Sequence, residues 1–273
     1  MRTGGASSLR SIPTLLTLLF LLLAGARVPA EPAYLAIIVD DLGNARAAGE
    51  RAAALPGPVT CSVLPHTPYA VQLAGRCKDA GKDVLLHLPM QPLDPDAKPG
   101  RGVLLIGQGR AEFRAAVTQS LAAVPGADGV NNHMGSLLTR HIGYMHWLME
   151  DLGRHPDLVF VDSMTTAHSR ALVAARAHGM PATRRDLFLD DDPSPAAVRR
   201  QWQRLIRQAR TQGSALGIGH PRPATLDLLA VELEALDDAG IILVGVAELI
   251  RLRHTPEQSW SESSSLLPMA SKR

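Results

Sequence analysis

The stretch Tyr34-Leu-Ala-Ile-Ile-Val-Asp-Asp41 (YLAIIVDD) sets the fold class of this 273-residue chain. Its first six residues are apolar or aromatic throughout, which is typical of a parallel strand that is covered on both faces. Two carboxylates follow directly, and an amphipathic stretch that begins near Asn44 indicates a helix. A buried strand followed by a helix is the unit of an α/β protein, so we expect that class.

The same strand-and-helix unit recurs along the chain. Further strands are predicted at Val59–Leu64, Val84–Leu88, Gly129–Met134, Leu158–Asp162, Ala215–His220 and Ile241–Val246, with weaker ones at Val103–Ile106 and Pro181–Asp186. About seven or eight such units favour a distorted (β/α) barrel. An open doubly wound sheet would usually carry a Gly-rich nucleotide turn, and Gly107-Gln108-Gly109 is only a weak approximation to one.

Helices are expected between these strands, several of them opened by a proline or a capping side chain. Their predicted starts lie near Asn44, Pro68, Arg110, His141, Ala167, Pro195 and Pro223. The chain is 46% apolar and 20% charged, which excludes intrinsic disorder as its general state. We expect a single barrel domain over residues 31–255 and, because the end is Ser-rich and aperiodic, a disordered tail over 256–273.

Residues 1–30 have the pattern of a signal peptide. Arg2 and Arg10 precede an apolar run from Pro13 to Ala26, and Val28-Pro29-Ala30 offers small residues for cleavage. An uncleaved anchor is the alternative, but the run is shorter than the roughly 20 residues that span a bilayer. We therefore expect a periplasmic or secreted protein without a stable membrane span after processing.

Removal of that segment changes the charge of the chain. It holds three of the 28 basic residues (Arg2, Arg10 and Arg27) and no acid, so 25 bases face 26 acids afterwards, a net charge of about −1. A nearly neutral body gives a nucleic-acid partner little electrostatic basis. Two cysteines remain, Cys61 and Cys77, and the sequence leaves open whether they form a disulfide or stay as buried free thiols.

Polar side chains gather at the carboxyl ends of the predicted strands, where a parallel barrel places its active site. These residues are Asp40, Asp41, His87, Asn132, His133, Asp162 and His220. Of two adjacent carboxylates, one can bind a metal while the other serves as a base, although one could instead cap the next helix. Neutral imidazole together with carboxylate suits zinc and related divalent ions.

The chain resembles the divergent polysaccharide deacetylases, a branch of the carbohydrate esterase deacetylase superfamily. The segments that carry the resemblance are IIVDDLGN, SVLPHTPYA, HLPMQP, NNHMGS, FVDS, RRDLFLD, GIGHPRP and LVGVAEL, from Ile37 to beyond Val244. The resemblance implies a barrel with a metal-dependent amide hydrolase site. Asp40 would be its base and Asp41 a metal ligand, and His220 would be its acid.

The rest of the site departs from the broader superfamily. Gln91 stands where ordinary members carry a second metal histidine after His87, and His133 is the natural substitute because its strand ends at the same mouth. The Arg-Pro-Tyr motif that helps to form the oxyanion site in ordinary members is also absent. The metal and a backbone N–H near Met134 or Gly135 would stabilise the oxyanion.

A second set of residues is expected to support the first. Asn132, Asp162 and Asp186 would orient the ligands from behind, with Arg185 holding a carboxylate, and the acids could equally be helix caps or salt-bridge partners. The resemblance, taken together with these residues, implies two possible functions. One is an exported deacetylase, with a divalent metal such as Zn, that acts on N-acetylated glycan or peptidoglycan, and the other is a non-catalytic glycan-binding or envelope-organising protein on the same barrel.

Overall fold

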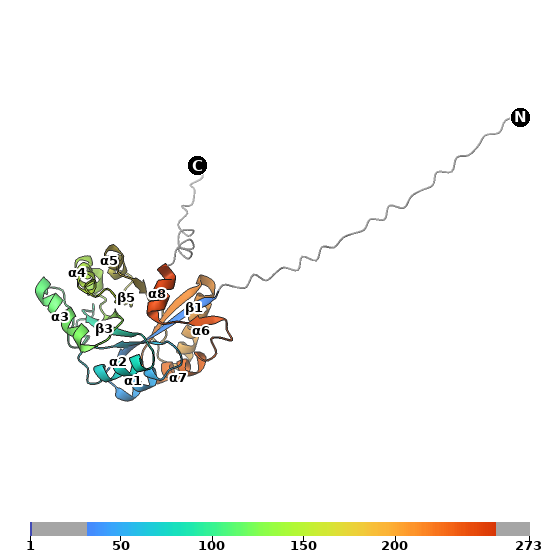
Figure 1. The fold of residues 1–273 in the computed structure, drawn as a ribbon, viewed down its shortest axis with the longest axis horizontal. Coiled ribbons are helices and arrows are strands. Elements are labelled where there is room, and N and C mark those ends of the chain that lie inside the picture. The colour runs from blue at the N-terminus through green and yellow to red at the C-terminus, as the bar shows by residue number, and fades with distance from the viewer. Residues whose placement is uncertain (2–31, 255–273) are drawn as a thin grey trace. The chain divides into compact units, whose positions relative to one another are not determined.

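The computed structural model describes Met1 and residues 32–254, so the predicted signal peptide and tail lie outside the described residues. Nine strands alternate with helices in this part of the chain (Figure 1). The strands are β1 (Ala33–Leu42), β2 (Thr60–Val63), β3 (Val84–Met90), β4 (Gly129–Met134), β5 (Val159–Asp162), β6 (Ala182–Arg184), β7 (Leu187–Phe188), β8 (Ser214–Gly219) and β9 (Ile241–Leu243).

The helices begin close to their predicted starts, except a short 3₁₀ helix and the last helix, which were not predicted. They are α1 (Arg46–Ala53), α2 (Ala70–Asp79), α3 (Arg110–Ala123), η1 (Leu138–Arg140), α4 (Ile142–Leu152), α5 (Ala171–Ala177), α6 (Pro195–Gln212), α7 (Pro223–Glu232) and α8 (Val246–His254). Two local expectations are wrong. The predicted strand at Val103–Ile106 contributes only an isolated bridge between Leu104 and Met90, and the one at Ile241–Val246 ends at Leu243, after which α8 begins.

The strands form one parallel sheet in the order β6-β5-β4-β3-β2-β1-β8-β7, with β9 pairing to β1 as a branch. This curled half-barrel confirms the predicted α/β barrel class. Its two ends, β6 and β7, are not paired to each other within the described residues. Because the strands run parallel, their carboxyl ends lie along one edge of the sheet, and the expected site should lie there.

Alternate residues of the strands pack into two separate cores. Leu35, Ile37 and Val39 of β1 belong to the large outer core under most of the helices. Ala36 and Ile38 belong to a smaller core, to which α8 contributes Val246, Leu249 and Ile250. Side chains of a strand alternate between its faces, so α8 fills the inner face of the half-barrel. None of the described helices is both long and apolar enough to cross a membrane.

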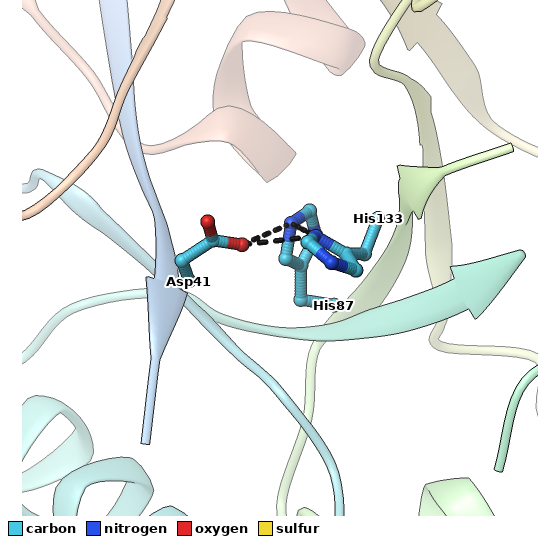
Figure 2. Close-up of side chains that lie close together, drawn as sticks. All are labelled: Asp41, His87 and His133. Carbon is cyan, nitrogen blue, oxygen red and sulfur yellow. Dashed lines mark hydrogen bonds and ion pairs between the residues drawn. The ribbon is translucent and has the colours of Figure 1, made fainter. Parts of the chain in front are cut away.

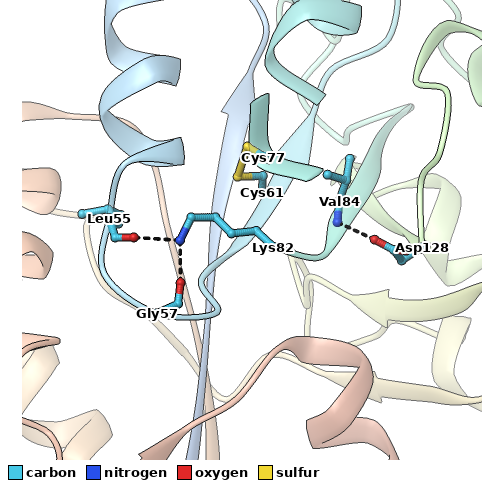
Figure 3. The surroundings of a disulfide bond; sticks show 7 residues. All are labelled: Leu55, Gly57, Cys61, Cys77, Lys82, Val84 and Asp128. Atoms are coloured by element: carbon cyan, nitrogen blue, oxygen red, sulfur yellow. Dashed lines mark hydrogen bonds between the residues drawn. A yellow bond between two sulfur atoms is a disulfide. The ribbon is translucent and has the colours of Figure 1, made fainter. Parts of the chain in front are cut away.

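A disulfide joins Cys61 of β2 to Cys77 of α2 (Figure 3). It settles the alternative that the sequence left open in favour of the bridge. Both cysteines are fully buried in the outer core. Nearby, the Lys82 ammonium donates hydrogen bonds to the carbonyls of Leu55 and Gly57, and burial lowers the pKa of Lys82.

Candidate metal centre

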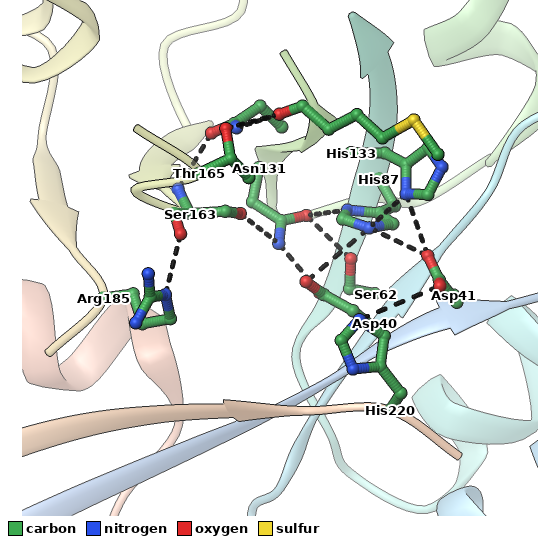
Figure 4. A network of polar contacts seen from close by, with 12 residues as sticks. Asp40, Asp41, Ser62, His87, Asn131, His133, Ser163, Thr165, Arg185 and His220 are labelled. Carbon is green, nitrogen blue, oxygen red and sulfur yellow. Dashed lines mark hydrogen bonds and ion pairs between the residues drawn. The ribbon is translucent and has the colours of Figure 1, made fainter. Parts of the chain in front are cut away.

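The inner face of the half-barrel carries the candidate site at the carboxyl ends of its strands (Figure 4). Asp40 follows Ala36 and Ile38 at spacings of two, and His87 follows Leu85 in the same way. His220 continues the inner series of Leu216 and Ile218. The two-residue period of a strand thus sends these side chains into the barrel and not into the helices.

Asp41 reaches the same centre although it is adjacent to Asp40. An ordinary strand would turn adjacent side chains to opposite faces. Here the backbone of Asp41 has a φ of 58°, and the register between β1 and β2 shifts between Val39 and Leu42. Aspartate tolerates this left-handed conformation better than most residues. The irregularity lets both carboxylates face one centre.

Three side-chain atoms converge at that centre (Figure 2). Asp41 Oδ1 lies 2.9 Å from His133 Nδ1 and 3.2 Å from His87 Nε2. The two imidazole nitrogens are 3.1 Å apart. Ligand atoms about 2.0–2.1 Å from a tetrahedral zinc ion lie about 3.3 Å from one another, so the spacing fits a single divalent ion.

The charges at the centre also favour a cation. Asp41 Oδ1 is buried and accepts no hydrogen bond. A buried carboxylate oxygen without a partner is costly unless a cation lies next to it. Burial raises the pKa of Asp41, but His133 and His87 outweigh this effect and hold that pKa far below its usual range. An ionised Asp41 beside two imidazoles is a set of residues that fits a divalent metal.

Asp40 and His220 lie beside the three converging atoms. Asp40 is 2% exposed, and its Oδ2 lies 3.6 Å from His87 Nε2. His220 Nε2 lies 3.8 Å from Asp41 Oδ2, and its Nδ1 is 2.8 Å from Asp190 Oδ1. Burial lowers the pKa of His220, but the hydrogen bond and charge of Asp190 outweigh it and raise that pKa. A carboxylate and a histidine whose pKa is raised thus both lie beside the centre.

The five residues expected around one cleft, Asp40, Asp41, His87, His133 and His220, are brought together by the structure. Gln91 instead has a structural role, because its Oε1 accepts a hydrogen bond from the Ile106 backbone N–H and its carbonyl accepts from Leu137 and Leu138. His133 on the neighbouring strand supplies the nitrogen that Gln91 lacks.

The expected supporting residues lie elsewhere. Asn132 and Asp162 are on the outer face of their strands, where Asn132 Oδ1 accepts from the Ser163 N–H and Asp162 accepts from the Met164 N–H and the Ser169 hydroxyl. Burial raises the pKa of Asp162. Both residues hold the turn after β5, and their described contacts include no histidine.

Asp186 and Arg185 also differ from expectation. Asp186 Oδ2 accepts from the Leu216 N–H and forms an ion pair with Arg253 at 2.6 Å, because Asp186 lies beside the middle of β8 and not its end. Arg185 donates to the carbonyls of Ser163 and Met164 instead of holding a carboxylate. Its guanidinium lies 3.6 Å above the Phe188 ring, which stacks on His220.

Three residues at the site were missed by the sequence reasoning. Asn131 lies on the inner face and contacts His87, the Ser62 hydroxyl donates to Asn131, and Asp190 holds the His220 ring. The alternation of β4 was a signal for Asn131, because Asn131 and His133 are two residues apart and must share a face. Asp190 lies in the quoted segment RRDLFLD, but nothing local distinguishes it from Asp186.

A half-barrel with carboxylates and histidines at the carboxyl ends of its parallel strands is an α/β barrel with a candidate metal site. The family model for divergent polysaccharide deacetylase matches residues 37–250. The chain belongs to the divergent polysaccharide deacetylase family.

The chain is also similar to two curated proteins and to a solved structure. The chain is 35% identical over 212 residues to the uncharacterized protein YibQ of Escherichia coli K12, covering 78% of this chain and 66% of YibQ. It is 37% identical to an uncharacterized protein of Haemophilus influenzae, covering 80% of this chain and 76% of that protein. The crystal structure of the uncharacterized protein ATU2773 of Agrobacterium tumefaciens matches with a TM-score of 0.77 and 26% identity, covering 81% of this chain and 90% of that one.

Proposed function

We propose that the protein is an exported, metal-dependent deacetylase of N-acetylated envelope polysaccharide. The observation that carries this proposal is the convergence of Asp41 Oδ1, His87 Nε2 and His133 Nδ1, with Asp40 and His220 beside them. Family membership supports the N-acetylated glycan as substrate class. The predicted signal peptide supports export, and the Cys61–Cys77 disulfide suits an oxidising compartment.

The protein's own residues would divide the work of amide hydrolysis. Asp41, His87 and His133 would hold a divalent metal such as Zn, which lowers the pKa of water and polarises a carbonyl. Asp40 would accept the proton of the attacking water through Oδ2, the oxygen that faces the centre. His220 would donate a proton from Nε2 to the leaving amine, while Asp190 accepts the hydrogen bond from Nδ1–H.

Two substitutions should separate binding from chemistry. His133→Ala should strip the metal, because it removes one of three ligands. Asp40→Asn should leave the metal bound and abolish turnover, because a base is needed for chemistry and not for coordination. The measurements are elemental analysis of the mature protein and acetate release from N-acetylated glycan fragments. His155→Ala, an exposed histidine, is the matched control.

The second candidate is a non-catalytic glycan-binding protein. The absent Arg-Pro-Tyr motif favours it, because that motif helps to form the oxyanion site in ordinary members. Under this candidate the wild-type protein holds metal stoichiometrically yet releases no acetate from any envelope glycan. Metal retained unchanged by His133→Ala would instead contradict the ligand set.

A further inference from the structure

Asn131 of β4 joins the proposed base to one of the proposed metal ligands. Its side chain is fully buried at 0% exposure. Its Nδ2 donates to Asp40 Oδ1 at 2.8 Å and to Ser163 Oγ at 3.2 Å. Its Oδ1 accepts from Ser62 Oγ at 2.7 Å and lies 2.9 Å from His87 Nδ1 (Figure 4). All of the hydrogen-bonding capacity of the carboxamide is therefore used inside the site.

These contacts determine which way the carboxamide points. In the structure the Nδ2 of Asn131 faces Asp40 Oδ1 and Ser163 Oγ, and a carboxylate oxygen of a residue that acts as a base accepts this hydrogen bond. The other atom is then the carbonyl oxygen, and it can only accept. His87 must consequently carry its proton on Nδ1, which leaves the lone pair of Nε2 directed at Asp41 and His133.

The same amide group selects between the oxygens of Asp40. Oδ1 is held by the Asn131 NH₂, whereas Oδ2 is the oxygen 3.6 Å from His87 Nε2. One neutral side chain thus fixes both the ligand nitrogen of His87 and the free oxygen of Asp40. A carboxylate in its place could still accept from His87 but could not donate to Asp40 when ionised.

We propose that Asn131 is a positioning residue that sets the His87 tautomer for metal binding and aims Asp40 Oδ2 at the reacting water. This inference rests on the proposed function and deepens it. Its two halves depend on different atoms of one side chain, the carbonyl oxygen for the ligand and the NH₂ group for the base. Suitable substitutions can therefore separate them.

Asn131→Leu removes both halves at similar volume. We expect it to weaken Co²⁺ or Zn²⁺ binding to the metal-free mature protein by about 10–100-fold, the usual effect of losing an outer hydrogen bond to a metal-binding histidine. Asn131→Asp keeps the acceptor for His87 and loses the donor to Asp40. We expect this variant to bind metal as tightly as wild type, or more tightly, while kcat for acetate release falls by at least about 10-fold.

Ser62→Ala is the matched control, because it deletes one hydrogen bond to the same oxygen without changing those to His87 and Asp40. It should change the metal affinity by less than about 3-fold, well under the loss from a direct histidine partner. The inference is overturned if Asn131→Leu binds metal like wild type, if Asn131→Asp loses metal as Asn131→Leu does, or if Ser62→Ala reproduces the loss.

The two proposals can fail separately. A wild-type protein that binds metal but releases no acetate overturns the deacetylase function. In that case the metal affinities of the three variants still decide whether Asn131 sets the His87 tautomer. The claim that Asn131 orients Asp40 for catalysis is then rejected together with the deacetylase function. Asn131→Asp also covers the case in which Asn131→Leu does not fold, because it preserves shape and most hydrogen bonds.

Discussion

His220 keeps its ring in place through a single carboxylate. Asp190 is fully buried and accepts hydrogen bonds from His220 Nδ1, the His220 backbone N–H and the Thr225 hydroxyl. Burial raises the pKa of Asp190, but these bonds and the His220 charge outweigh it and lower that pKa. The pair therefore favours an ionised Asp190 beside a protonated His220.

The pH dependence of turnover should reveal this pair. A general acid must be protonated, so the rate falls as pH rises through the pKa of His220, which Asp190 raises. Asp190→Asn removes the negative charge, lowers that pKa and should move the alkaline limb of the kcat profile to lower pH. A limb that stays in place would show that another group titrates there. Asp192→Asn, on an exposed carboxylate, is the control.

Single residues mark the limit of what the sequence could predict at the site. The convergence of Asp41, His87 and His133 was predictable, because strand-end position and residue type point to all three, whereas the role of Asp41 as a metal ligand follows only from the family resemblance. The sequence predicts Asn132 at the site together with His133, whereas the two-residue period of β4 turns Asn132 outward and Asn131 inward. The sequence predicts Asp186 as a supporting residue, whereas Asp190 contacts His220 in the structure, because strand register, which the sequence does not reveal, decides which acid reaches that ring.

At the scale of elements, α8 was the helix that the sequence reasoning did not predict. The run from Ile241 is apolar enough to predict one strand, but the chain changes from strand to helix at Gly245. Gly245 lies directly against the Asp83 carboxylate, which would contact an added Cβ at 2.4 Å. Asp83 Oδ2 accepts a hydrogen bond from the Ala247 N–H in the first turn of α8. A residue distant in sequence thus caps the helix.

Loss of this cap should destabilise the protein. Asp83→Ala leaves the Ala247 N–H without its acceptor, and we expect the free energy of unfolding in urea to fall by about 1 kcal/mol. Asp79→Ala, at an exposed position on α2, should change it by less than about 0.5 kcal/mol. Equal effects of the two substitutions would contradict the capping role.

The disulfide should stabilise the β2–α2 unit. Cys61 and Cys77 are separated by 16 residues, and closing a loop of that size lowers the entropy of the unfolded chain. Replacing both cysteines with alanine should cost about 3 kcal/mol in urea unfolding under oxidising conditions. Under reducing conditions, wild type and variant should differ much less, and a persistent difference would point to side-chain packing as the cause.

At the scale of the whole molecule, Arg253 of α8 spans the opening of the half-barrel. Its guanidinium donates to Thr183 of β6, to Ser214 of β8 and to Asp186 beside β7. The sequence predicted the barrel class, because repeated strand-helix units suffice for that. It could not predict where the sheet stays open, since this depends on contacts among segments far apart in the chain.

Arg253→Leu should test this connection. The substitution removes hydrogen bonds to three side chains and leaves the Asp186 carboxylate without its ion pair. We therefore expect the free energy of unfolding to fall by about 2–3 kcal/mol. Arg253→Lys keeps the positive charge but lacks the several N–H donors of the planar guanidinium, so its free energy of unfolding should fall by less than that of the leucine variant. Thermal unfolding followed by circular dichroism measures both, and equal stability of the leucine variant and wild type would contradict the role.

The open sheet also bears on how the protein avoids self-association. Unpaired strand edges can template pairing with another chain and so promote aggregation. The strands at the two ends are very short, with three residues in β6 and two in β7, and therefore present few free backbone groups. Arg253, with a positive charge beside both ends, would further discourage an incoming strand. The half-barrel can thus stay open without presenting a long unpaired strand edge to which another molecule could add a strand.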